Sequence, residues 1–171
     1  MLVAASITFP QFVLAIHILA VVIGFGGVFA FPLVFGAATR SDPAVIPLLL
    51  RTRQQLGRYL INPGLLVVVL AGIYLASKEH QWGNFYVGWG VIAALVLGGL
   101  EGSLITRPAG RLAEQAERDL AATAVPAGGQ RTSATWSSEY ITAMRRFTFA
   151  GNAMAAIVVL TVFFMATHLG A

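Results

Sequence analysis

Three histidines are the side chains in this sequence best suited to bind a metal. His17 lies within the first long apolar stretch, His168 near the end of the last one, and His80 in a short polar segment. A neutral imidazole binds haem iron or copper well, and a polar side chain at membrane depth needs a partner or a ligand. We therefore expect His17 to ligate the iron of haem b, or copper, or to bond a neighbouring helix through a backbone carbonyl, Tyr74 or Tyr86.

His168 is the second, weaker candidate for cofactor binding. Counted at about 1.5 Å per residue from the predicted membrane interfaces, it lies roughly 6 to 10 Å shallower than His17. Two axial histidines must reach the iron at one depth, so Met or water is the alternative sixth ligand. His80 has charged neighbours and is expected to be solvated. The chain has no cysteine, which excludes thiolate sites and haem attachment through CxxCH.

Glu101 is the only acidic residue inside an apolar stretch. It lies near the end of the third stretch, on the side where arginines gather. The first explanation is a structural ion pair with a nearby arginine, Arg146 before Arg145 or Arg58. The alternative explanation is a role in proton relay.

The composition places these residues in a membrane protein. Of 171 residues, 57% are hydrophobic and 11% charged, against roughly 45–50% and about 25% in a soluble domain. So few charges cannot cover a soluble surface, and a soluble monomer is excluded. Residues 1–171 are predicted to form one transmembrane domain with four spanning helices, at about 12–35, 59–77, 85–106 and 147–167.

The charges between these stretches predict an orientation. Residues 40–58 hold four arginines and one aspartate, and residues 107–146 hold six arginines and four acids. The segment 77–84 holds only one lysine and one glutamate. By the positive-inside rule, the loops 36–58 and 107–146 are cytoplasmic and both termini lie outside. The expected partner is the lipid bilayer rather than nucleic acid, because the basic residues form no solvent-facing stripe with aromatics.

Parts of the two cytoplasmic loops are expected to be helical. Ser41 or Asp42 can cap a helix that starts at Pro43 and runs on into the second span. The sequence Asn62-Pro63-Gly64 predicts a kink there. Residues 111–122 carry good helix formers and a narrow apolar stripe, suited to a lid or a docking surface. The predicted fold is an all-α polytopic membrane four-helix bundle with a short cytoplasmic helix in the third loop.

The first apolar stretch resembles the first helix of a group of bacterial four-helix membrane proteins. Its pattern is a histidine, an apolar turn, a glycine, then an aromatic residue and a proline, at His17, Gly27, Phe29 and Pro32. The group includes the haem-containing membrane protoporphyrinogen oxidases, the copper-resistance D proteins and an uncharacterised integral membrane family. The Phe163–His168 ending is similar to that last family. The resemblance implies a bacterial cytoplasmic-membrane location and a haem or copper ligand at His17.

The third stretch departs from the oxidases, because it lacks the lysine and the further histidines that they carry there. Three hypotheses therefore stay open. The first is a haem b binder in electron transfer or haem handling. The second is a cofactor-free accessory subunit of a homo-oligomer or larger membrane complex. The third is copper handling, although no methionine-rich or cysteine cluster accompanies the histidines.

Overall fold

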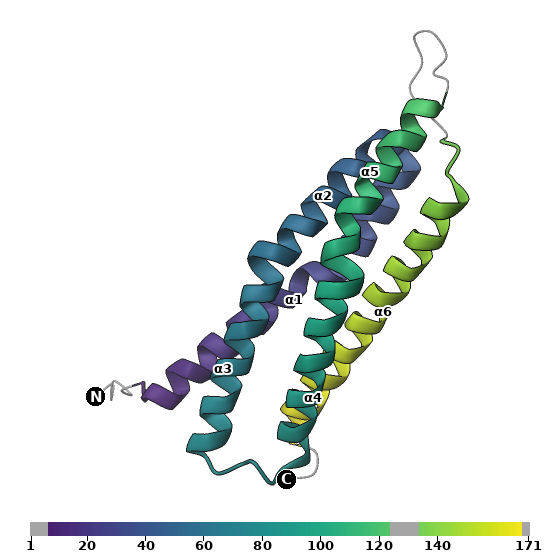
Figure 1. Cartoon of the computed structure of the whole chain (residues 1–171). Helices are drawn as coiled ribbons and strands as arrows, with labels where there is room; N and C mark the ends of the chain where they lie inside the picture. The colour runs from purple at the N-terminus through teal and green to yellow at the C-terminus, as the bar shows by residue number, and fades with distance from the viewer. Residues whose placement is uncertain (1–6, 124–133, 169–171) are drawn as a thin grey trace.

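The computed structural model describes residues 7–123 and 134–168, and these fold into four long helical segments (Figure 1). The first is α1 (Phe9–Ser41) and the last is α6 (Ser138–Thr167). The second runs through η1 (Pro43–Val45), α2 (Ile46–Leu56), η2 (Gly57–Ile61) and α3 (Asn62–Lys78). The third runs through α4 (Phe85–Leu100), η3 (Glu101–Thr106) and α5 (Arg107–Ala122). Helix α1 starts and helix α6 ends at the same end of the bundle.

All four segments are long and apolar enough to cross a membrane, which confirms the all-α, four-span prediction. Only 17% to 22% of the residues in the most apolar window of each segment are buried within the chain. In a water-soluble bundle such apolar windows would face the core. Here they face outward, and lipid or other protein must cover them.

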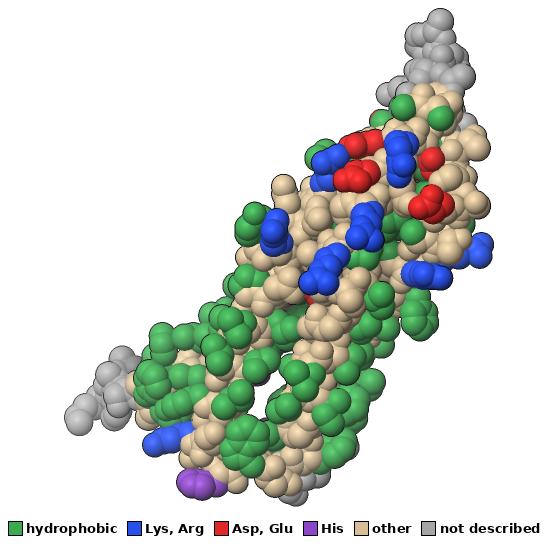
Figure 2. Space-filling model, viewed as in Figure 1, with side chains coloured by type: hydrophobic (Ala, Val, Ile, Leu, Met, Phe, Trp, Pro, Cys, Tyr) green, Lys and Arg blue, Asp and Glu red, His purple; other side chains and the backbone are tan. Residues whose placement is uncertain are grey.

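The second and third segments are longer than a membrane is thick. They contain 36 and 38 residues, or about 54 and 57 Å at 1.5 Å per residue, against a hydrocarbon core of about 30 Å. Their excess length projects from the bundle as α2 packed against α5. Charged side chains gather over this part, which we call the arginine end (Figure 2). The opposite end, with the α3–α4 loop and the end of α6, is called the histidine end.

The helix expected at residues 111–122 is present at the arginine end as α5 (Arg107–Ala122), but it continues the third span instead of lying by itself in the loop. Helix α5 continues α4 through η3, and its apolar stripe is buried at Leu112, Ala116 and Leu120. Because α5 packs along α2, this stripe is neither a lid nor a free docking surface. In contrast, the prediction that the first loop is helical and runs into the second span is confirmed. Asp42 begins that helix by accepting a hydrogen bond from the Ala44 backbone at 2.8 Å.

Both long segments contain a π-helical turn just before a proline. Turn η2 ends at Ile61, two residues before Pro63, and η3 ends at Thr106, two residues before Pro108. A proline has no N–H and its ring clashes with the carbonyl four residues earlier, so a wider turn relieves the conflict. Where the sequence predicts a kink, near Asn62-Pro63-Gly64, the structure has a π turn. The two turns contact each other, and they contain three of the largest fully buried side chains, Ile61, Glu101 and Ile105.

Towards the histidine end the bundle divides into two helix pairs, α1 with α3 and α4 with α6. In the first pair Gly24 faces Gly64, where a Cβ on Gly64 would lie 3.3 Å from the Gly24 Cα. In the second pair the Met165 side chain covers Gly90. Figure 2 shows an opening through the molecule between α3 and α4 in this half. These three glycines therefore allow close packing within each pair, while the two pairs are separated in this half of the molecule.

Candidate functional site

A buried ion pair joins the second and third segments at the π-helical turns. Arg53 Nη1 donates to Glu101 Oε1 at 2.8 Å, and Nη2 donates to Oε2 at 2.7 Å. The side chains are 4% and 0% exposed. Such a bidentate pair is short and geometrically specific. The arrangement neutralises two charges that would be very costly to bury singly.

Helical spacing explains why these two side chains meet. The buried positions of the second segment include Ile46, Leu50, Arg53, Gly57 and Ile61, three or four residues apart. Glu101 occupies the same kind of stripe on the third segment, between Leu97 and Ile105. Each charge thus takes the place of an apolar residue on a core-facing stripe, and the antiparallel helices bring the two charges level.

Thr106 and Gly57 complete the ion-pair site. The Thr106 hydroxyl donates to Glu101 Oε1 at 2.8 Å, which gives that oxygen a second donor. Gly57 faces both groups, and a Cβ there would overlap the Thr106 hydroxyl. The ring of Phe31 lies beside the guanidinium, with its centroid 5.9 Å from Cζ. The carboxylate is therefore held from two sides in a space that only glycine leaves open.

The prediction that Glu101 forms an ion pair with Arg146 is wrong about the arginine, because the partner is Arg53. Arg146 and Arg145 are exposed on α6, and Arg58 is exposed on η2. Arg53 lies about two helical turns before the predicted start of the second span, at residue 59, so its distance along the sequence from the spans did not indicate it as a partner. The signal that could have found it is the 3–4 spacing that places Arg53 between Leu50 and Gly57 on one helix face.

A crevice between α1 and α6 reaches this ion pair. It has a volume of about 130 Å³, and buried Arg53 is among the residues that line it. Buried Val28, Ile105 and Phe147 line the crevice together with Arg53, and exposed Thr148 lines it as well. The crevice therefore connects the membrane-facing surface of the bundle to a charged group.

His17 lies in the seam between α1 and α3. Its Nδ1–H donates to the Val68 carbonyl oxygen at 2.9 Å, and Gly72 leaves room for the ring, whose Cε1 would lie 3.3 Å from a Cβ there. A carbonyl oxygen only accepts, so Nδ1 carries the hydrogen of the neutral ring and Nε2 keeps its lone pair. This is the helix-to-helix bond that we expected as one explanation of His17, and it also leaves one nitrogen free for a metal.

The other two histidines lie at the histidine end. His168 ends α6 in the left-handed backbone region (φ 49°), exposed, and its ring meets the edge of Tyr86 with centroids 5.3 Å apart. Because His168 contacts α4 while His17 contacts α3, these contacts do not bring the two rings together. His80 is exposed in the α3–α4 loop. Among the described residues, no three His, Cys, Asp or Glu side chains form a metal-binding group.

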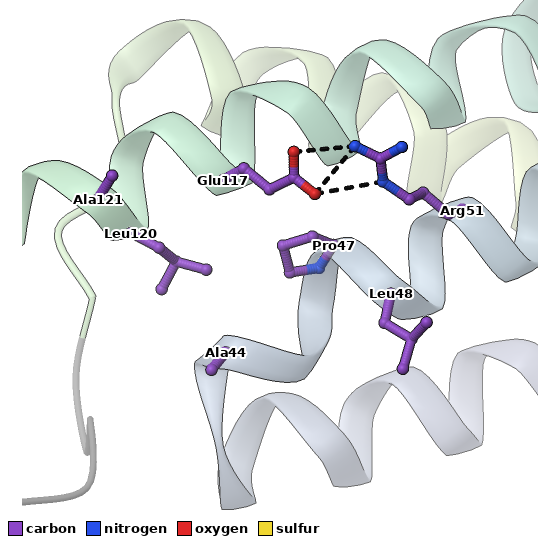
Figure 3. A pocket seen from close by; sticks show the side chains of 7 residues that line it. All are labelled: Ala44, Pro47, Leu48, Arg51, Glu117, Leu120 and Ala121. Atoms are coloured by element: carbon purple, nitrogen blue, oxygen red, sulfur yellow. Dashed lines mark hydrogen bonds and ion pairs between the residues drawn. The ribbon is translucent and has the colours of Figure 1, made fainter.

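A second depression lies between α2 and α5 at the arginine end (Figure 3). Arg51 and Glu117 bridge it with bonds of 2.9 to 3.2 Å, and both side chains are about half exposed (52% and 47%). Solvent screens such a pair, so it contributes at most about 1 kcal/mol. This depression is an open surface feature at the junction of two packed helices.

Comparison with known proteins identifies no family, because no family model, no curated protein and no solved structure matches the chain. The class that the fold itself defines is a polytopic four-helix membrane protein. The resemblance of the first apolar stretch to haem and copper membrane proteins stays a prediction.

Proposed function

We propose that the protein binds haem b through His17, in electron transfer or haem handling. The observation that carries the proposal is the bond from His17 Nδ1 to the Val68 carbonyl. In a metal-bound histidine, the N–H of the second ring nitrogen characteristically donates a hydrogen bond to a carbonyl or carboxylate. This bond fixes the tautomer and orients the nitrogen that binds the metal. The His17 ring has this arrangement in the α1–α3 seam.

The surroundings of His17 are consistent with one strong protein ligand. Its ring is only partly buried in the α1–α3 seam, so Nε2 is not enclosed by the chain. His168 is a weak second ligand, since its contacts are with the other helix pair. Met165 packs on Gly90 in that same pair, so water rather than Met would complete the coordination of the iron. Bound haem would supply one-electron exchange, while the protein would supply the ligand and an apolar surrounding.

Visible spectroscopy tests this proposal directly. Protein purified in mild detergent from haem-replete cells should show a Soret band, with sharper visible bands after dithionite reduction. His17→Ala should abolish the band, whereas the matched variant His80→Ala should leave it unchanged. His168→Ala should reduce it less than His17→Ala. A colourless wild-type preparation, or a band that survives His17→Ala, would reject haem binding at this residue.

A second candidate function is a cofactor-free subunit of a homo-oligomer or larger membrane complex. The low burial of all four spans and the separation of the two helix pairs favour it. Because the chain has no cysteine, single cysteine variants report contacts between copies cleanly. Gly26, on the open face of α1, is a suitable position. If Gly26→Cys forms a disulfide-linked dimer while a variant on α4 such as Leu95→Cys stays monomeric, a homo-oligomer packed through α1 is supported.

The third hypothesis, copper handling, would use His17 with methionine thioether ligands. Met165 covers Gly90 in the α4–α6 pair, and Met154 is fully buried in the core of the bundle. His17 lies instead in the α1–α3 seam. Haem therefore ranks above copper as the group proposed for His17. Metal analysis of the purified protein by mass spectrometry separates the two, since iron and copper are counted independently.

A further inference from the structure

The crevice between α1 and α6 is lined mostly by apolar residues and by one charged side chain. Arg53, 3% exposed, is the one charged residue that lines it, and exposed residues of both helices line it too. Its volume of about 130 Å³ is far below the roughly 300–1,000 Å³ of sites that enclose a drug-sized ligand. A head group fits this space, while the remainder of a larger molecule would extend from the rim.

The buried guanidinium still has hydrogen-bond donors to offer. Within residues 7–123 and 134–168, Arg53 donates two hydrogen bonds, both to Glu101. Its remaining N–H groups have no acceptor among these residues, although the side chain lines the crevice. Arg53 Nε is not fully enclosed, since Gln115 Oε1 is the only enclosed side-chain polar atom without a partner in this part of the chain, and Nε can donate to a molecule in the crevice. An acceptor atom that enters the crevice would therefore be stabilised at Arg53.

The charge balance decides which kind of acceptor fits. Glu101 already neutralises Arg53 at 2.7 to 2.8 Å. An incoming carboxylate or phosphate would place a second negative charge beside that carboxylate, where the low dielectric strengthens repulsion and desolvation is costly. A neutral carbonyl oxygen accepts the same hydrogen bonds without that repulsion. The site therefore favours an uncharged, carbonyl-bearing head group.

The walls favour a flat ring. Phe31 and Phe35 stack with centroids 5.5 Å apart, and Phe147 meets Phe31 edge to face at 6.3 Å. Aromatic side chains arranged in this way pack best against another planar π-system. At the rim, Thr148 and Asn152 provide polar groups for a second carbonyl. The crevice lies near the arginine-end limits of the predicted spans 12–35 and 147–167, so a molecule dissolved in the bilayer can enter it.

We propose that the α1–α6 crevice binds the ring of a lipid-soluble quinone, with Arg53 donating a hydrogen bond to one quinone carbonyl. The quinone tail extends past the rim into the lipid. This inference rests on the crevice and on the ion pair, and not on haem binding at His17, so either can fail alone.

Calorimetric titration of the detergent-solubilised protein tests the site with three probes that share a ten-carbon chain. Decylubiquinone should bind, decylbenzene should bind at least tenfold more weakly because it has no carbonyl, and decanoate should bind at least tenfold more weakly because it is charged. Gly151→Leu fills the crevice, since a Cβ at Gly151 meets no atom within 4 Å. It should weaken decylubiquinone binding at least tenfold.

Gly99→Leu is the matched control, because Gly99 is exposed on α4 and a Cβ there also meets no atom within 4 Å. It should bind decylubiquinone like the wild type. Thr148→Phe, at the rim, provides a second block of the crevice if Gly151→Leu does not fold. Equal affinity for decylbenzene would overturn carbonyl recognition, and tighter binding of decanoate would assign the site to an anionic lipid instead. Unchanged decylubiquinone affinity in a folded crevice variant would overturn the location.

Discussion

Gly57 and Glu101 lie against each other where the two π-helical turns meet. A Cβ on Gly57 would lie 2.5 Å from Glu101 Oε1. Real Cβ atoms do not approach this closely, so the glycine is required by the carboxylate that it faces. The buried ion pair therefore depends on a position that makes no hydrogen bond to it.

Gly57→Ala should destabilise the protein by about 1–3 kcal/mol, because the added methyl group must displace Glu101 or Thr106 from a packed site. Thermal or denaturant unfolding in detergent measures this loss. Gly102→Ala is the control on the neighbouring π turn, since a Cβ there meets no atom within 4 Å. It should be neutral or slightly stabilising. Equal stability of the two variants would contradict the close packing at Gly57.

Glu101→Gln should lower the free energy of unfolding by about 3–5 kcal/mol, because Arg53 would keep a buried charge without a counterion. Arg146→Gln should change it by less than about 1 kcal/mol, because Arg146 is exposed. A double variant, Arg53→Met with Glu101→Leu, should recover much of the loss by removing both charges. Normal stability of Glu101→Gln with loss of a measured activity would instead favour a proton-relay role.

Gly64→Val should disrupt the α1–α3 pair. A Cβ at Gly64 lies 3.3 Å from the Gly24 Cα, and the backbone of α1 cannot move aside as a side chain can. We expect lower unfolding stability, by about 1–3 kcal/mol, together with altered orientation of His17 further along the same seam. Gly26→Val, on the open face of α1, is the matched control and should leave stability near the wild-type value.

Reporter fusions should place both termini outside the cell membrane and the arginine end inside. The basis is the gathering of arginines between the first and second and between the third and fourth spans. Fusions ending at Thr39, Ser77, Gln130 and Ala171 should read inside, outside, inside and outside. An outside signal at Gln130 with an inside signal at Ala171 would invert the orientation and move the histidine end to the cytoplasm.

Hydropathy and charge by themselves determined the class of this protein. Stretches of about 20 apolar residues must form helices in lipid, because only internal hydrogen bonds satisfy the backbone there. The continuity of α2 with α3 and the irregular turn near Pro63 were also predictable, since a proline imposes local geometry on its own helix. These properties depend on residues near one another in the chain.

Only the tertiary structure decided which side chains meet. Arg53 and Glu101 are 48 residues apart, and their pairing depends on the relative height of two antiparallel helices. Likewise, three kinds of partner were compatible with the sequence around His17, and the packing of α1 on α3 presents the Val68 carbonyl. Spacing along one helix indicates which face is buried, but it contains no information on the register between helices. That register is set by backbone contacts such as Gly24 with Gly64, which exist only once the helices have packed.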